Sequence, residues 1–516
     1  MARIRYATIE RLCADDVGMR RDVRLDTAVT AKRRAWVPIL IVAIGALVVF
    51  AAHFRPWEGG LLEEWAIARD LKVYGWWGLI ENYLEWSLSR PLHLVPTMLG
   101  LAAGGGEPAG IFLVMGLVAM GQYLAVIWAL RPISRSTWVN VAVALFVGLH
   151  PLWAAGYLQR FLPAQTSALA LMIALGFMIR WLQQGRARWL VGVCVSLMLG
   201  FAAYQGPAAV APVMALALAL ALRAGWRRGI ALVVAATASS AAMAAYAIVV
   251  VRLVTPADQD SYELINIAAA GVSGPGELIR LVAGTFLSSG RFLVLGVLAV
   301  VLLAAILSLT RTIPHEAGWV MAGVALTSPV CAVVYFGNTA WLSDIDRVAF
   351  TTSLALVVAL VIWPLTAREH QRPLQTVLAA VLIVVAMVGG LLGVATWQPF
   401  VRVQHQLLSA LEPVVHEATG DETVVVVDHS GTFGQLYTLP LGYINGASMI
   451  SNDDATDVLL CLPQSTPYPV PPGNVICDPT SAGFDLRPAG TLTLPSGDVD
   501  FFIGNVDSDE FMKGYR

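Results

Sequence analysis

Two adjacent carboxylates, Glu63 and Glu64, are the side chains whose type and spacing best suit acid–base chemistry. Like charges repel each other and lose hydration near lipid, so we expect the pKa of one carboxyl to rise. A carboxylate with a raised pKa suits a general base at neutral pH. The pair could instead bind a divalent cation that neutralises a phosphate. The plainer alternative is a solvated acidic turn that opens a helix, where glutamate is mildly favourable.

Three arginines are candidates for binding a phosphate: Arg90, Arg160 and Arg347. A guanidinium at headgroup depth can hold a phosphate through two parallel hydrogen bonds. The common alternative is an arginine that extends its charge to the membrane interface. For Arg347, an ion pair with the neighbouring Asp344 or Asp346 would explain the residue equally well.

Aromatic side chains surround the acidic pair, and an aromatic–amide pair lies further along the chain. Trp65, Trp76 and Trp77 favour a functional loop, although tryptophan is also enriched at membrane interfaces for reasons of solvation. Tyr204 and Gln205 stand between two apolar segments. A glutamine there costs free energy unless it is hydrogen-bonded, so we expect this pair to line a cavity.

The composition indicates the class of protein that must position these residues. The chain has 516 residues, of which 57% are AVILMFWYC and only 13% are DEKR, whereas soluble domains carry about 25% charged residues. The sequence therefore predicts a polytopic membrane protein. It contains no Walker A, HExxH or paired CxxC motif and no GxGxxG after a strand, which argues against nucleotide-driven chemistry and gives no metal signature.

The apolar runs predict about eleven transmembrane helices and an orientation. The basic tail, residues 1–35, is expected to be cytoplasmic and to signal topology rather than bind nucleic acid. The predicted spans are 36–52, 109–130, 138–152, 164–181, 188–204, 206–222, 228–251, 286–310, 317–336, 348–366 and 373–396. This count places the loop 54–96 and the C-terminal region 400–516 outside the cytoplasm, with an interfacial helix over 91–103.

The C-terminal region 400–516 changes character and predicts a small α/β domain. Thr423–Asp428, Asp457–Leu462 and Asp498–Gly504 have the short apolar pattern of strands. In an oxidising compartment Cys461 and Cys477 could form a disulfide, and two unpaired buried thiols are the alternative.

The loop motifs resemble those of membrane glycosyltransferases of the GT-C type, and most closely the O-antigen glucosyltransferase family (Gtr type II). The similarity rests on the acidic pair Glu63–Glu64 in the first outward loop, on Arg90–Leu92 opening the next helix, and on Tyr204–Gln205 heading a middle span. The family usually has aspartates at the pair and glycine where this chain has Ser89. The resemblance covers about residues 36–400.

The resemblance implies an all-α, GT-C-like membrane domain over 36–399 that transfers a sugar, glucose in that family, with inversion. The donor would be a polyprenyl-phosphate sugar and the acceptor a surface glycan or lipid-linked glycan, with a flippase and a donor synthase as partners. Glu63 or Glu64 would be the base, while Arg90 and Arg347 would stabilise the departing phosphate. Tyr204 and Gln205 would help to bind the donor, and Trp65, Trp76 and Trp77 could stack on sugar faces. No cofactor is required, and a divalent cation stays open. The alternatives are a transporter or flippase of lipid-linked glycan and a non-catalytic envelope assembly protein.

Overall fold

The computed structural model describes residues 36–83, 88, 90–134, 136–254, 275–335, 345–368, 371–433, 443–453, 455–462 and 485–506. The basic tail 1–35, Ser89 and Cys477 lie outside these residues. The chain forms two compact units, Met1–Val48 and Val49–Arg516. The described part of the first unit is helical throughout.

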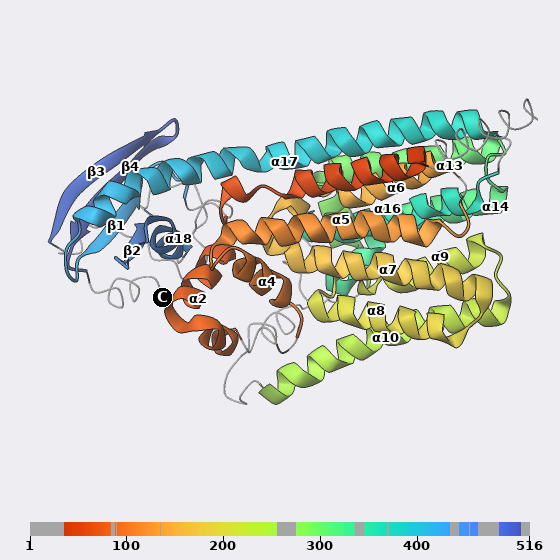
Figure 1. Ribbon diagram of the computed structural model, residues 1–516, viewed down its shortest axis with the longest axis horizontal. Helices are drawn as coiled ribbons and strands as arrows, with labels where there is room; N and C mark the ends of the chain where they lie inside the picture. Colours follow the sequence, from red (N-terminus) through yellow and green to blue (C-terminus); the bar gives the residue numbers. More distant parts are fainter. Residues whose placement is uncertain are drawn as a thin grey trace, which may run out of the picture. The chain divides into compact units, whose positions relative to one another are not determined.

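The second unit is a helical bundle with a small sheet (Figure 1). Its α-helices are α2 (Glu63–Asn82), α4 (Val95–Ala103), α5 (Ile111–Leu130), α6 (Thr137–Gly148), α7 (Leu162–Gln184), α8 (Ala187–Ala203), α9 (Val210–Ala221), α10 (Trp226–Val254), α12 (Pro275–Ser288), α13 (Arg291–Leu309), α14 (His315–Thr327), α16 (Ile345–Thr366), α17 (Arg372–Glu417) and α18 (Tyr443–Asn452). Short 3-10 turns are η1 (Pro56–Glu58), η2 (Pro108–Gly110), η3 (Ala154–Tyr157), η4 (Gln159–Phe161), η5 (Gly206–Ala208) and η6 (Ser328–Tyr335).

Among the described residues, seven helical segments are long and apolar enough to cross a membrane. They are Trp36–Glu58, Pro108–Leu130, Gln159–Gln184, Trp226–Ala247, Arg291–Leu309, Ile345–Thr366 and Arg372–Glu417. Shorter apolar helices cover Thr137–Gly148, Ala187–Ala203, Gly206–Ala221 and Ile279–Ser288. These segments support the membrane character predicted from composition, while the count of about eleven spans and their orientation stay predictions.

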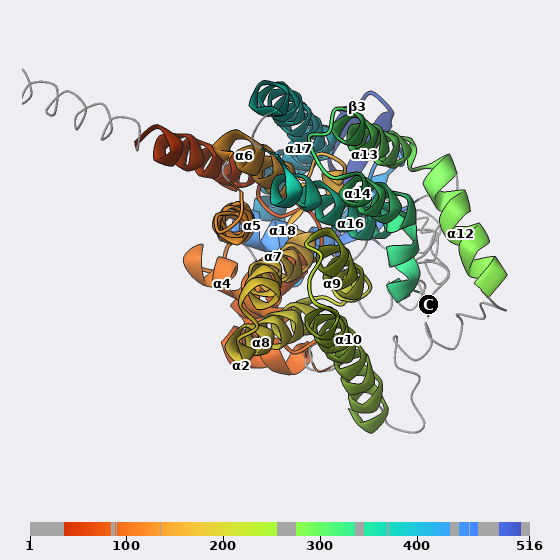
Figure 2. The same ribbon diagram turned by 90° about the vertical axis from the view of Figure 1, so that its right-hand side faces the viewer.

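The bundle is built around α16. In the most apolar 18-residue stretch of this helix, 94% of the residues are buried. It packs against α14, α9, α13 and α6, as the view along the bundle shows (Figure 2). By contrast, only 22% of the residues in the most apolar stretch of α17 are buried, and Leu391 of this helix is 67% exposed. An apolar surface of this kind suits contact with lipid, because lipid removes the cost of exposing it to water.

Two sequence expectations change in detail. The predicted span 317–336 is interrupted, since α14 ends at Thr327 and is followed by the 3-10 turn η6. The predicted interfacial helix over 91–103 begins later, because Pro91–Leu94 forms turns before the nine-residue α4. Proline explains part of this difference, since Pro96 suits the first turn of a helix.

Helix α17 joins the bundle to the sheet without a linker. At 1.5 Å per residue, its 46 residues extend about 69 Å. The predicted domain boundary between residues 399 and 400 falls inside this helix. Its second half leaves the bundle and lies along the sheet (Figure 1).

The sheet has four strands in the order β2-β1-β4-β3. Strand β1 (Thr423–Asp428) pairs in parallel with β2 (Val458–Cys461) and antiparallel with β4 (Gly497–Gly504), which pairs antiparallel with β3 (Leu486–Leu494). The three predicted strands are present. Strand β3 was not predicted. Its largely exposed residues include a proline and a glycine, and they contain no apolar run.

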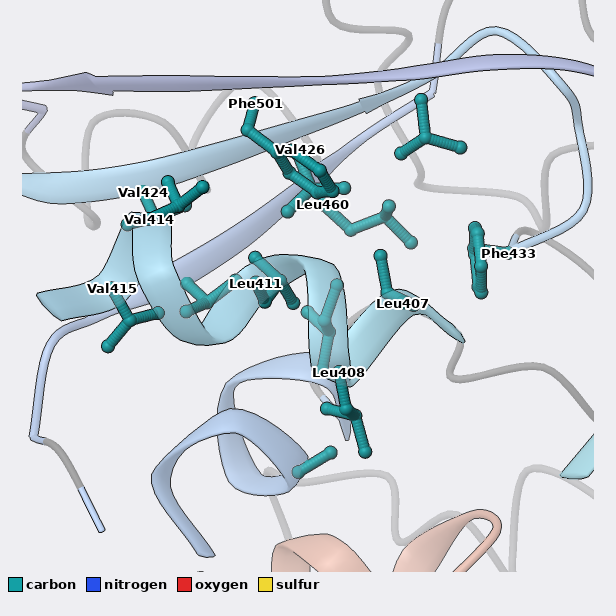
Figure 3. Close-up of a cluster of buried hydrophobic side chains, with 14 of the residues drawn as sticks. Leu407, Leu408, Leu411, Val414, Val415, Val424, Val426, Phe433, Leu460 and Phe501 are labelled. Carbon is teal, nitrogen blue, oxygen red and sulfur yellow. The ribbon is translucent and has the colours of Figure 1, made fainter. Parts of the chain in front are cut away.

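One face of the sheet forms a core with α17 (Figure 3). Leu407, Leu411 and Val414 of the helix point toward Val426 and Phe501 of the strands. Side chains alternate along a strand, so Val425 and Val427 reach the opposite face, where they cluster with Cys461. Cys461 takes part in a disulfide, and its predicted pairing with Cys477 stays a prediction.

Leu411→Ala tests whether this core holds the end of α17 on the sheet. Leu411 is fully buried, so the loss of its side chain should cost about 2–5 kcal/mol through lost burial and a cavity. We expect a lower Tm in detergent and faster proteolysis of the C-terminal region. Leu391→Ala is the matched control on the same helix, and equal effects of both substitutions would contradict the packing.

Candidate functional site

A buried ion pair fixes the chain just before α2. Arg55 and Glu58 are 3% and 1% exposed, and Arg55 Nη1 lies 2.9 Å from Glu58 Oε2. Arg55 also donates a hydrogen bond to the Tyr157 carbonyl in η3. Gln398 of α17 donates to Glu58 Oε1 at 2.5 Å. The ion pair therefore ties η1 to both the bundle and α17.

The next residues are held by α17 as well. Gln404 Nε2 donates to the Gly60 carbonyl at 2.6 Å, and its Oε1 accepts from the Trp65 indole at 3.4 Å. His405 Nε2 lies 3.3 Å from the Glu58 carbonyl oxygen. Backbone and side-chain contacts on both sides of Glu63–Glu64 therefore set where α2 begins.

The acidic pair opens α2, but only one of its carboxyls is accessible. Glu64 is 3% exposed, and its Oε2 accepts from the Leu62 amide at 3.0 Å. Burial, followed by the negative charge of Glu63, raises the pKa of Glu64 to about 7. The alternative interpretation, a solvated acidic turn, correctly predicts that the pair begins a helix. It is wrong about the solvation of Glu64, which is buried.

Glu63 faces Arg160 of η4. Arg160 Nη2 lies 3.1 Å from Glu63 Oε1, and both side chains are partly exposed. The second oxygen, Glu63 Oε2, is buried and accepts no hydrogen bond from the part of the chain that the structure describes. Such an oxygen is costly unless a hydrogen bond reaches it, so it is suited to accept a proton from a bound hydroxyl. Arg160, predicted as a phosphate ligand, is thus placed to orient this carboxylate.

A second group of functional candidates, around Arg90, lies where α8 ends. Arg90 Cζ lies 5.9 Å from the centroid of the Tyr204 ring. His93 Nδ1 donates to the Ala203 carbonyl at 3.0 Å, and the Leu92 amide donates to Ala202 at 3.0 Å. These bonds pin the turn that carries Arg90 to the end of α8.

Arg347 acts on the same group. Burial, then the charge of Arg90 and, to a smaller extent, that of Arg347, lowers the pKa of His93 to about 4. His93 is therefore neutral at pH 7, and both guanidiniums lie within electrostatic range of it. Gln205 follows Tyr204 and is half-buried. The structure thus places Arg90 beside Tyr204, and both Arg90 and Arg347 near His93.

Packed aromatic rings connect the two groups. Phe161 lies beside Arg160 and packs on Trp153 with ring centroids 5.5 Å apart. Trp153 packs on Phe350 at 4.6 Å, and Phe350 packs on Tyr204 at 5.7 Å. In addition, Ser167 Oγ of α7 donates to the Tyr204 carbonyl at 2.8 Å. The acidic pair and the arginine group therefore belong to one contiguous region of the bundle.

The three tryptophans divide into two kinds. Trp65 is 5% exposed and belongs to the core shared by α17 and the sheet, so the prediction that it stacks on a sugar is wrong in this structure. Trp76 and Trp77 follow a kink at Gly75, where φ is 70°, and are 44% and 73% exposed. Both remain available for a sugar or for the membrane interface.

A metal site or a match to a known protein family would be independent evidence of function. The described residues contain no group of three or more His, Cys, Asp or Glu that could hold a metal ion, and a divalent cation that is also bound by substrate stays untested. The chain matches no known protein family and no curated protein.

Glu58→Gln tests the buried ion pair. The amide keeps the shape of the side chain but leaves the Arg55 charge without its counter-ion, which should cost about 3–5 kcal/mol. We expect a lower Tm and a lower yield of protein. The double variant Arg55→Leu/Glu58→Leu removes both charges and should be less damaging than Glu58→Gln. The reverse order would contradict the role of the pair.

Glu64→Gln tests the raised pKa through stability. The ordinary pKa is 4.5 and the folded value is about 7, so the unfolded carboxyl releases its proton first as pH rises. The wild type therefore loses stability between these two values, and the glutamine variant does not. The Tm of the variant should exceed that of the wild type above pH 7, and the difference should shrink toward pH 4.5. Glu81→Gln, at an exposed site on the same helix, should leave the pH dependence unchanged, and parallel curves for Glu64→Gln would refute the assignment.

Proposed function

We propose that this protein is a membrane glycosyltransferase that moves a sugar from a polyprenyl-phosphate donor to a glycan. The transfer would take place on the outer face of the membrane, and the sugar is glucose in the family that the chain resembles. The observation that carries the proposal is the buried, unpartnered Oε2 of Glu63, next to Arg160 and the raised-pKa carboxyl of Glu64. This arrangement is what a base for a hydroxyl group needs, because the base must be within hydrogen-bond reach of the proton it takes.

Glu63 is the better candidate for the base. Its side chain is partly exposed, whereas Glu64 is only 3% exposed. The hydroxyl proton would pass to Glu63 Oε2 as the hydroxyl oxygen bonds to the anomeric carbon of the sugar. The bond from that carbon to the phosphate oxygen breaks at the same time, and the phosphate leaves with the electron pair. Attack opposite the leaving group inverts the anomeric configuration.

The arginine group would serve the leaving phosphate. Arg90 and Arg347 both act electrostatically on the neutral His93, so two positive charges lie near this ring. Fixed cations lower the energy of the transition state in which negative charge develops on the phosphate. A lipid-linked donor also agrees with a chain that carries apolar helices of membrane-spanning length.

A transporter or flippase of lipid-linked glycan is the second candidate. Transporters place charged residues and broken helices near mid-membrane. In the described part of this chain, the acidic pair and Arg90 lie outside the seven membrane-length helices, and Arg160 and Arg347 lie within two residues of the ends of such helices. Placement at the helix ends favours a reaction at the membrane surface.

Glu63→Gln in cells that display the modified glycan tests the proposal. The amide cannot take a proton, so sugar transfer, measured by mass spectrometry of the glycan, should fall by about 100-fold or more at a normal protein level. Arg90→Gln should also reduce transfer and leave unreacted donor in the membrane. Glu81→Gln is the control on α2. Full activity of both Glu63→Gln and Glu64→Gln would exclude this mechanism, and loss of donor translocation without loss of transfer in vesicles would favour the flippase.

A further inference from the structure

Helix α18 of the C-terminal region packs directly against the first turns of α2. A side-chain carbon added at Gly446 would lie 2.7 Å from the Trp65 carbonyl oxygen, so only glycine allows this approach. Lys72 Nζ lies 2.5 Å from Asp453 Oδ1 and donates to the Met449 carbonyl at 3.3 Å. The contact therefore runs from the start of α18 to the residue just beyond its end.

Trp65 makes this contact part of a shared core. Its side chain, one residue after the acidic pair, is buried with Leu411 of α17 and with Ile444 and Ala447 of α18. Moving α18 away would expose this apolar surface, which is unfavourable by roughly 25 cal/mol for each Å² uncovered. The position of α18 relative to Glu63 and Glu64 is therefore set by packing.

Tyr443 is the first residue of α18, the helix that packs against the start of α2. It is half-buried and packs against the same core. Burial, then the negative charge of Glu63, raises the pKa of the Tyr443 phenol to about 12, while Arg160 lowers it. The phenol is therefore protonated at neutral pH and can donate a hydrogen bond.

We propose that Tyr443 is supplied by the C-terminal region to position the sugar-hydroxyl acceptor against Glu63, and that the docking of α18 on α2 completes the site. This inference rests on the proposed function. The Tyr443 hydroxyl would donate to an oxygen of the acceptor, and Glu63 Oε2 would accept the proton of the attacking hydroxyl. The C-terminal region would then be required for transfer because it holds a side chain of the acceptor subsite.

Tyr443→Phe isolates the hydroxyl group. The ring and its packing remain, so the Tm should stay within experimental error of the wild type. Transfer is measured in membrane vesicles with polyprenyl-phosphate glucose and with surface polysaccharide from cells that lack this protein. We expect the KM for the polysaccharide to rise about tenfold, as for the loss of one hydrogen bond, with little change in the KM for the donor. Tyr74→Phe, at an exposed site on α2, is the control.

Gly446→Val tests the docking itself. The added side chain should push α18 from α2, so transfer should be lost and proteolysis of the C-terminal region should accelerate. An unchanged KM for the polysaccharide in Tyr443→Phe, with Glu63→Gln inactive, would overturn this inference and leave the proposed function intact. Full activity of Glu63→Gln would instead remove the proposed function on which the inference rests.

Discussion

The buried ion pair between Arg55 and Glu58 is the constraint on which the candidate site depends. Neither charge can return to water without breaking the fold, and either one alone would be left in an apolar surrounding. Arg55 also donates a hydrogen bond to the Tyr157 carbonyl, and Glu58 accepts one from Gln398. Glu63 and Glu64 follow Glu58 within six residues. The position of the acidic pair therefore depends on where the Arg55–Glu58 ion pair holds the chain.

Helix α17 extends the same constraint to the C-terminal region. One continuous helix supplies Gln398 and Gln404 to the loop and then Leu407 and Leu411 to the core of the sheet. Pro399 and Pro413 lie inside this helix, and a proline removes a backbone hydrogen bond, so the stiffness of the helix alone does not fix the sheet. The contacts of Gln398 and Gln404 with the loop, and of Leu407 and Leu411 with the sheet, hold both parts on the same helix.

Charge is divided between two groups that have different surroundings. At the acidic pair, burial and repulsion favour proton binding by Glu64, while the ion pair with Arg160 holds Glu63 in place. Around His93, burial keeps the ring neutral, so Arg90 and Arg347 provide the positive charge. One group therefore carries a carboxylate that can accept a proton, the other carries positive charge, and packed aromatic rings lie between them.

The sequence by itself determined the local features: apolar helices of membrane-spanning length, the strands β1, β2 and β4, and the acidic pair at the start of a helix. These depend on composition and on the spacing of neighbouring residues, which the chain displays directly. Only the tertiary structure decided that Trp65 is a core residue, that Glu64 is buried while Glu63 meets Arg160, and that α18 packs against the start of α2. Such facts depend on contacts between residues far apart in the chain, and no local pattern encodes the burial that shifts a pKa or the partner that neutralises a charge.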